Sequence, residues 1–258
     1  MSSESRQGWL PERLTTADGE SRRVGIEIEL AGIDPELIST LLEDLYGGKV
    51  VEKTRFEFSV VDTRFGDFKL ELDSAYLKRL AVEEASKHLP PDALGSITAD
   101  LLARASELLV PWEIVTPPIA FADAESLCDL VSLLRRHGAL GTRHAPQFAF
   151  GVHLNPELPD LKAHTIVNYM RAYFCLYDWI VARERIDLTR KLTPYIDHFP
   201  KPYIRKVVDP GYRPSQQQLI EDYLRHNPTR NRSLDMLPLF SYLDEALVRS
   251  VVDDDRIN

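Results

Sequence analysis

Cysteine, long apolar runs and an apolar leader are scarce or missing in this sequence. Its two cysteines, Cys128 and Cys175, lie in apolar patterns of helical spacing, and we expect both thiols in the core. No run of 18 apolar residues is present, which argues against a membrane-spanning helix. The polar residues 1–16 lack the apolar segment of a secretory signal. We therefore expect a cytoplasmic protein with no membrane partner.

Positively charged residues are also fewer than negatively charged ones. The chain has 31 Lys and Arg against 40 Asp and Glu, a formal net charge of −9, so we expect no nucleic-acid partner. The motifs GxxxxGK(S/T), GxGxxG, HExxH and GxSxG are absent, and with them the common signatures of phosphate loops, zinc peptidases and serine hydrolases. Binding of a polyanion through a metal stays open, because a cation reverses the local field.

The chain does contain alternating strand and helix patterns. We expect a flexible leader over residues 1–20 and a single domain over 21–258. Strands are predicted over 22–31, 111–118 and 146–157, and residues 49–74 read as two strands joined by a turn near 62–66. Helices are predicted over 34–48, 74–88, 98–109, 123–138, 159–186, 214–227 and 233–254. Because the two strands of 49–74 form a hairpin, an α+β fold is favoured.

The stretch RRVGIEIELAG (22–32) places acidic side chains on one face of a strand. Glu27 and Glu29 share that face with Gly25, and apolar side chains occupy the other. Two carboxylates about 7 Å apart on one face repel each other.

Three further predicted strands repeat this division into a polar and an apolar face. The polar faces carry Lys69, Glu71 and Asp73, then Glu113, then Gly151, His153 and Asn155. The apolar faces, Val152 and Leu154 among them, are expected in the core. If the polar faces share one side of a sheet, they form a trough of up to five carboxylates, an imidazole and an amide. The alternative is an ordinary solvated sheet face.

Such a trough predicts bound cations, because several adjacent carboxylates stay ionised only when a positive charge neutralises them. Oxygen ligands in this number suit Mg²⁺ or Mn²⁺. Magnesium commonly shares phosphate oxygens, so a nucleotide is the expected co-ligand. Gly25 and Gly151, which lack side chains, leave room for that ligand.

Phosphate contacts are expected from arginines late in the chain. Arg190 and Arg232 are the candidates, because each lies beside an irregular segment, and Arg suits bidentate phosphate contacts. Surface solubility or helix capping is the alternative role for both. The Pro- and Tyr-rich segment 187–213 is expected to be an active-site loop. An aromatic set at helical spacing is expected in the core, not around a pocket: Tyr169, Tyr173, Phe174, Tyr177 and Trp179.

The motifs VGIEIEL, ELDS, WEIVTPPI and FGVHLNPE, in this order, resemble the amidoligase family. That family belongs to the carboxylate–amine ligases related to glutamine synthetase and glutamate–cysteine ligase, and the resemblance spans residues 22–240. It implies a glutamine-synthetase-type fold, in which a curved, largely antiparallel sheet with helices on its outer face surrounds ATP and divalent metals. The late acidic and arginine-bearing strand of such families has no counterpart in the closing VVDDDRIN.

The resemblance also implies roles for the residues of the trough. The metal ligands would be Glu27, Glu29, Asp73, Glu113 and His153. Catalysis would fall to Glu71, Arg190 and Arg232. His153 would lie near a metal or an ATP phosphate, and Asn155 near the substrate, in the group of residues that binds the cofactor. Apart from the resemblance, Gly25 and Gly151 are expected to bind ATP because they leave room for it, and Arg185 because arginine suits phosphate contacts.

The implied activity is ATP- and Mg²⁺-dependent formation of an amide or peptide-like bond through an acyl phosphate. The partners would be ATP, a carboxylate substrate and an amine substrate, with a homo-oligomer as a further expectation. Two alternatives stay open: a non-catalytic adaptor of the same fold that binds nucleotide and metal, and a metal-dependent hydrolase or phosphotransferase.

Overall fold

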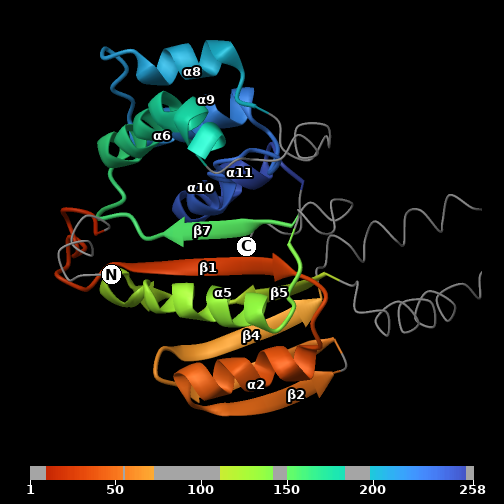
Figure 1. Ribbon diagram of the computed structural model, residues 1–258. Coiled ribbons are helices and arrows are strands. Elements are labelled where there is room, and N and C mark those ends of the chain that lie inside the picture. The colour runs from red at the N-terminus through yellow and green to blue at the C-terminus, as the bar shows by residue number, and fades with distance from the viewer. Residues whose placement is uncertain (1–9, 55, 73–110, 142–149, 184–197, 254–258) are drawn as a thin grey trace, which may run out of the picture. The chain divides into compact units, whose positions relative to one another are not determined.

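The structure is a computed structural model of the chain, in which residues 10–54, 56–72, 111–141, 150–183 and 198–253 are described (Figure 1). The chain divides into two compact units, residues 1–157 and 158–258. The first contains a sheet with helices, so the predicted α+β class is confirmed. The leader over 1–20 and the single domain over 21–258 stay predictions.

A seven-stranded, fully antiparallel sheet forms the first unit. Five strands follow one another in the order β2-β3-β4-β5-β1. Along one side of β1, its later residues pair with β5 and its first residues with the short β6. The strand β7 pairs with the other side of β1. The strands are β1 (Arg23–Leu30), β2 (Lys49–Thr54), β3 (Glu57–Thr63), β4 (Gly66–Leu72), β5 (Trp112–Val115), β6 (Ile119–Ala120) and β7 (Val152–Pro156).

The segment 49–74 contains three strands, so the prediction of two was wrong. The missed reversal lies between Thr54 and Glu57, where the Thr54 hydroxyl accepts a hydrogen bond from the Phe56 amide at 3.2 Å. Such a side-chain turn reverses the chain without glycine or proline, the residues that usually reveal a turn in a sequence. The predicted turn near 62–66 is present as the β3–β4 connection, with Asp62 at φ 57°.

In the described part of the first unit, two helices cover one face of the sheet (Figure 1). They are α2 (Pro35–Tyr46) and α5 (Ser126–Arg136), and a short 3-10 helix, η2 (Phe121–Asp123), precedes α5. Asp34 caps α2 by accepting from the Glu36 amide at 3.0 Å. The core between the helices and the sheet includes Phe68, whose ring stacks on Tyr46 at 5.1 Å.

The apolar face of β7 is exposed, contrary to the expectation that it lies in the core. Val152 is 59% exposed and Leu154 63%. Both pair with β1 residues on the face that the helices cover. Within the described part of the chain, however, β7 pairs only with β1, and α2 contacts β2 and β3 at the opposite edge of the sheet. Both cysteines are exposed as well, because Cys128 and Cys175 point away from the cores on which their helices pack.

The described helices of the second unit surround an aromatic core that includes Phe199, Tyr203, Tyr223 and Phe240. These helices are α6 (Ala163–Arg183), α8 (Lys201–Val208), α9 (Gln216–His226), α10 (Leu237–Leu243) and α11 (Glu245–Arg249).

Part of the predicted irregular segment 187–213 is helical, since it contains α8. Pro200 and Pro202 stand at the start of this helix, where a missing amide hydrogen costs nothing. Arg171 ties the end of α8 to α6 by donating to the carbonyls of Val207 and Asp209 at 2.8 Å each. The predicted helices 74–88 and 98–109 lie outside the described residues. Among the residues that are described, no helix has the length and apolar character needed to cross a membrane.

Thr116 lies between β5 and β6 and forms hydrogen bonds with β1 there. Pro117 and Pro118 follow it, and neither has an amide hydrogen to donate to the ladder. The Thr116 amide donates to the Ile26 carbonyl at 2.9 Å, and its hydroxyl accepts from the Ile26 amide at 3.0 Å. The side chain thus takes the place of a backbone acceptor next to Glu27.

We expect Thr116→Val to lower the free energy of unfolding by about 1–3 kcal/mol, because it leaves the Ile26 amide without an acceptor. The matched control is Thr40→Val on the exposed face of α2, with an expected change within about 0.5 kcal/mol. Urea unfolding followed by circular dichroism measures both. Equal effects of the two substitutions would contradict the role assigned to Thr116.

Candidate functional site

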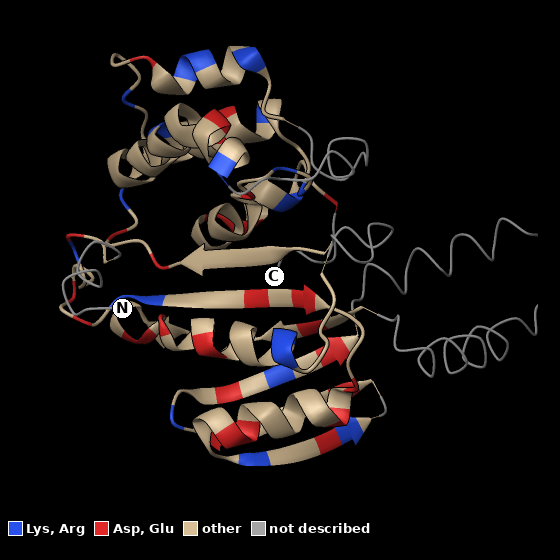
Figure 2. Ribbon diagram, viewed as in Figure 1, with Lys and Arg blue, Asp and Glu red and all other residues tan. Residues whose placement is uncertain are grey.

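Four glutamates form one row across neighbouring strands of the first unit. Glu57 is directly opposite Glu71, Glu71 is opposite Glu113, and Glu113 is opposite Glu29. Directly paired residues of an antiparallel sheet point to the same side, so the four carboxylates share one face. Figure 2 shows acidic positions of β1, β4 and β5 side by side. Like charges in such positions destabilise a sheet.

The next rows bring β7 to this face. Glu27 is directly opposite His153, and Gly25 is opposite Asn155. The Glu27 carboxylate contacts both polar side chains of β7: its Oε2 lies 2.7 Å from His153 Nδ1, and its Oε1 accepts from Asn155 Nδ2 at 2.9 Å.

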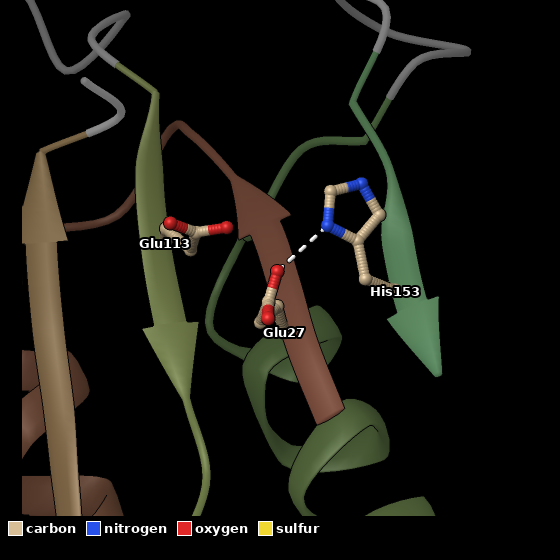
Figure 3. A group of neighbouring side chains, drawn as sticks. All are labelled: Glu27, Glu113 and His153. Carbon is tan, nitrogen blue, oxygen red and sulfur yellow. Dashed lines mark hydrogen bonds and ion pairs between the residues drawn. The ribbon is translucent and has the colours of Figure 1, made fainter. Parts of the chain in front are cut away.

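Glu27, Glu113 and His153 converge from three adjacent strands (Figure 3). One ligand atom from each lies within 4.8 Å of the others. Two carboxylate oxygens and one imidazole nitrogen at this spacing suit a small divalent cation such as Mg²⁺ or Mn²⁺. The arrangement can therefore hold a metal and leave positions for water or a substrate oxygen.

Glu29 is oriented by the backbone that leads into β7. Its Oε2 accepts from the Gly151 amide at 2.7 Å, and its own amide donates to the Gly151 carbonyl at 3.0 Å. Its other oxygen, Oε1, lies 4.0 Å from His153 Nε2. The carboxylate thus has one oxygen held by the protein and one directed toward the cluster.

Gly25 lies on the same face as Asn155. A Cβ at Gly25 would come no closer to another side chain than 3.8 Å, at Asn155 Cβ. The surrounding protein therefore does not require glycine at this position, and the role of leaving room for a ligand stays a prediction.

The pKa of His153 is raised above its ordinary value of 6.5. The largest cause is the hydrogen bond to Glu27, and the negative charges of Glu29 and Glu113 act in the same direction. Burial opposes the shift because it penalises the imidazolium. A cation in the cluster competes with this proton, since only the neutral imidazole is a ligand.

Eight of the predicted site residues lie on this one face: Gly25, Glu27, Glu29, Glu71, Glu113, Gly151, His153 and Asn155. Asp73, Arg185 and Arg190 lie outside the described residues. Arg232 belongs to the second unit, where its Nε donates to Asn227 Oδ1 at 2.9 Å and its guanidinium lies over the Phe199 ring at 5.8 Å.

Glu57 is the member of the face that the sequence analysis missed. It ends the glutamate row, and Lys53 Nζ lies 2.8 Å from its carboxylate. Its signal was available in EFSVVDT, where Glu57 alternates with the buried Phe58. Dividing 49–74 into two strands instead of three leaves Glu57 without a place on this face.

The fold and this face define an α+β protein with a carboxylate-rich sheet face suited to hard cations. The sequence matches the family model described as "Putative amidoligase enzyme" over residues 20–258, and the chain belongs to this family. The resemblance seen in the four motifs is thereby confirmed, and the family indicates a ligase role. Searches of the curated proteins and of the solved structures find no significant match.

We expect Glu27→Gln to lower the pKa of His153 toward 6.5, because the neutral amide no longer favours the imidazolium. NMR titration of the imidazole signals measures this shift. Glu20→Gln, a matched change at an exposed position, should leave the value unchanged. Divalent-cation binding to the wild type should tighten as pH rises through the raised pKa of His153. A wild-type pKa at or below 6.5 would contradict the geometry.

The glutamate row gives a second prediction, on stability. Without added cation, Glu71→Gln should raise the free energy of unfolding by about 0.2–1 kcal/mol, because it removes a charge that faces two like charges. Glu20→Gln again serves as the control. Chemical denaturation in the presence of a chelator measures both variants, and a loss of stability in Glu71→Gln would refute net repulsion along the row.

Proposed function

We propose that this protein is an ATP- and Mg²⁺-dependent carboxylate–amine ligase that forms an amide or peptide-like bond through an acyl phosphate. The observation that carries the proposal is the cluster of Glu27, Glu113 and His153 beside the glutamate row, in a member of the amidoligase family. The proposal includes a sheet of the glutamine-synthetase type.

The residues fit a magnesium ion by donor chemistry and by charge. Glu27 and Glu113 supply hard oxygen donors, and His153 supplies a nitrogen at the same point. The glutamate row places further negative charge next to the cluster, which a divalent cation offsets. When bound, Mg²⁺ would neutralise negative charge on the triphosphate, and ATP would provide the phosphoryl group for the substrate carboxylate.

The chain's own residues hold and orient these groups. Asn155 fixes one oxygen of Glu27 and so leaves the other for the cluster, and the Gly151 amide does the same for Glu29. Such contacts to metal ligands commonly change affinity or activity 10–100-fold. A carboxylate of this face accepts the proton that the amine loses when it displaces phosphate.

Arg190 and Arg232 remain the proposed contacts to the phosphates, on the basis of the family resemblance and of the bidentate geometry of arginine. Arg185 is proposed on the geometry of arginine alone. The role of Glu71 as a catalytic residue and of Asp73 as a further metal ligand are parts of the same proposal.

The decisive measurement is ADP and phosphate release from ATP with Mg²⁺ and a panel of carboxylate and amine pairs. We expect release that needs both organic substrates and stops with a chelator. Glu113→Gln should reduce the rate at least ~100-fold. Glu20→Gln should retain the wild-type rate, and circular dichroism verifies that both variants are folded.

The outcomes separate the alternatives. Tight, Mg²⁺-dependent ATP binding without turnover on any pair would favour an adaptor. Metal-dependent product formation without ATP would favour a hydrolase. Failure of the intact protein to bind ATP under every metal condition would overturn the ligase proposal.

A further inference from the structure

Two arginines follow one another at the start of β1, and only the first uses its side chain in the described hydrogen bonds. Arg22 is buried and donates to the carbonyls of Glu157 and Arg13. Arg23 is exposed, and the ion pairs among the described residues do not include its guanidinium. Its backbone is nevertheless fixed, because its amide donates to Glu157 Oε2 at 3.0 Å and its carbonyl accepts from the Glu157 amide at 2.8 Å.

Arg23 shares the carboxylate-rich face with Gly25 and Glu27, because alternate residues of a strand point to the same side. Figure 2 shows basic residues at the start of β1 and acidic residues further along it. At a rise of about 3.3 Å per residue, the Arg23 Cα lies ~7 Å from that of Gly25 and ~13 Å from that of Glu27. Along β1, Gly25 therefore separates Arg23 from the cluster of Glu27, Glu113 and His153.

We propose that Arg23 binds an oxyanion of a substrate over Gly25, on the side of that anion away from a metal ion held by the cluster. The oxyanion is a phosphate group of ATP or the carboxylate of the acid substrate. This inference rests on the proposed ligase function, which supplies the metal ion and both anions. It assigns to the first unit an arginine contact of the kind proposed for Arg232, which belongs to the second unit.

The surroundings of Gly25 support a ligand at this point of the strand. Its φ lies outside the left-handed region, so its backbone does not need glycine. Among the described residues, an added Cβ would come within 4 Å only of Asn155, at 3.8 Å from its Cβ. A glycine inside a strand weakens the sheet, and one use that offsets this cost is the close approach of a ligand. An anion over Gly25 would lie next to the carboxamide of Asn155, the residue directly opposite Gly25 on β7.

The charge of the face explains why an anion over Gly25 needs a positive partner on each side. The glutamate row repels oxyanions from this side of the sheet. A divalent ion in the cluster reverses the field at one end of Gly25. At the other end, the planar guanidinium of Arg23 offers two parallel hydrogen bonds to a phosphate or a carboxylate. Side chains of strands lean along the strand direction, so the guanidinium reaches the space over Gly25.

Lys69 provides a matched control, because it is a second basic residue on the same face. It is exposed, and it lies in the row of Glu27, with Val115 directly opposite both. Two strand spacings of about 4.8 Å place its Cα ~10 Å from that of Glu27, a distance comparable with that of Arg23. Lys69 is displaced across the strands, however, and does not flank Gly25. A general effect of positive charge would be common to both residues, whereas a direct contact over Gly25 would belong to Arg23.

The first experiment is isothermal titration calorimetry of the full chain with ATP and with inorganic pyrophosphate, each in excess Mg²⁺. For a phosphate contact, we expect Arg23→Gln to bind both ~10-fold less tightly than the wild type, because it loses charge-assisted hydrogen bonds. Lys69→Gln should change either affinity by less than ~3-fold in about 0.1 M salt, which screens exposed charges over ~10 Å. Equal losses in the two variants would overturn the direct contact.

A second pair of variants tests the position and the chemistry of the contact. Arg23→Lys should bind pyrophosphate with an intermediate affinity, because it keeps the charge and loses the planar fork. Gly25→Ala should fold, because the protein leaves room for the Cβ, and should bind pyrophosphate ~10-fold less tightly, because the methyl group overlaps the anion. Wild-type affinity in a folded Gly25→Ala protein would contradict a ligand over Gly25.

Binding of Mn²⁺ alone, measured by electron paramagnetic resonance, separates the anion contact from the metal cluster. Arg23→Gln should bind Mn²⁺ at least as tightly as the wild type, because it removes a positive charge from the face that holds the cation. Urea unfolding should give the same midpoint for both proteins, since the substitution leaves the backbone hydrogen bonds with Glu157 in place. Weaker Mn²⁺ binding or a lower midpoint would assign Arg23 to the metal site or to the fold, and would overturn the proposal.

The remaining outcomes distinguish the two anions and the two proposals. Unchanged affinities with a raised KM for the carboxylate substrate would identify that carboxylate as the anion. Unchanged affinities with an unchanged KM would overturn the contact and leave the ligase proposal standing, and where no substrate pair turns over, unchanged affinities alone overturn it. A wild type that binds magnesium pyrophosphate but not ATP would overturn the ligase proposal, and the loss of pyrophosphate affinity in Arg23→Gln would still support the contact.

Discussion

The register of the antiparallel sheet brings negative charges together, and the rest of the first unit serves to maintain that register. Glu29 and Glu71 both face Glu113 directly, an arrangement that pairing alone would not favour. What opposes the repulsion is the other face of the same strands, where Ile28, Leu70 and Ile114 are buried against helices. A slip by one residue would exchange the two faces and bury the carboxylates. Burial on one side therefore preserves the charged surface on the other.

The cluster of Glu27, Glu113 and His153 depends on how β7 is held beside β1. Arg22 is buried at the start of β1 and donates to the Glu157 carbonyl from both Nε and Nη2, at 2.9 and 2.6 Å. At the other end of β7, the Gly151 amide donates to the Glu29 carboxylate, and the Glu29 amide donates to the Gly151 carbonyl. These two clamps fix the strand on which His153 stands between Glu27 and Glu29. Among the described residues β7 pairs with β1 alone, so these anchors add support that a second neighbouring strand would otherwise give.

The second unit uses its longest helix in a different way. The inner face of α6 completes an aromatic core, and Arg171 fixes the end of α8 against it. The opposite side of α6 is exposed and bears Leu176 and Trp179.

Local alternation was sufficient to predict much of the polar face. The two-residue period of a strand identifies which side chains share a face, so Glu27 with Glu29, Glu71, Glu113, and His153 with Asn155 could all be assigned before any strand was paired. The same rule failed where exposure depends on distant partners. Val152 and Leu154 alternate as core residues do, but they lie on an edge strand.

By itself the sequence determined the α+β class, the family and the faces of the strands, because propensity, periodicity and motif order are properties of neighbouring residues. Only the tertiary structure decided which glutamates stand opposite one another, that Glu57 joins their row, and that Glu27, Glu113 and His153 meet within 4.8 Å. The physical reason is that register and convergence arise from pairing between strands far apart along the chain. That pairing is selected by burial of the whole sheet, not by any single segment.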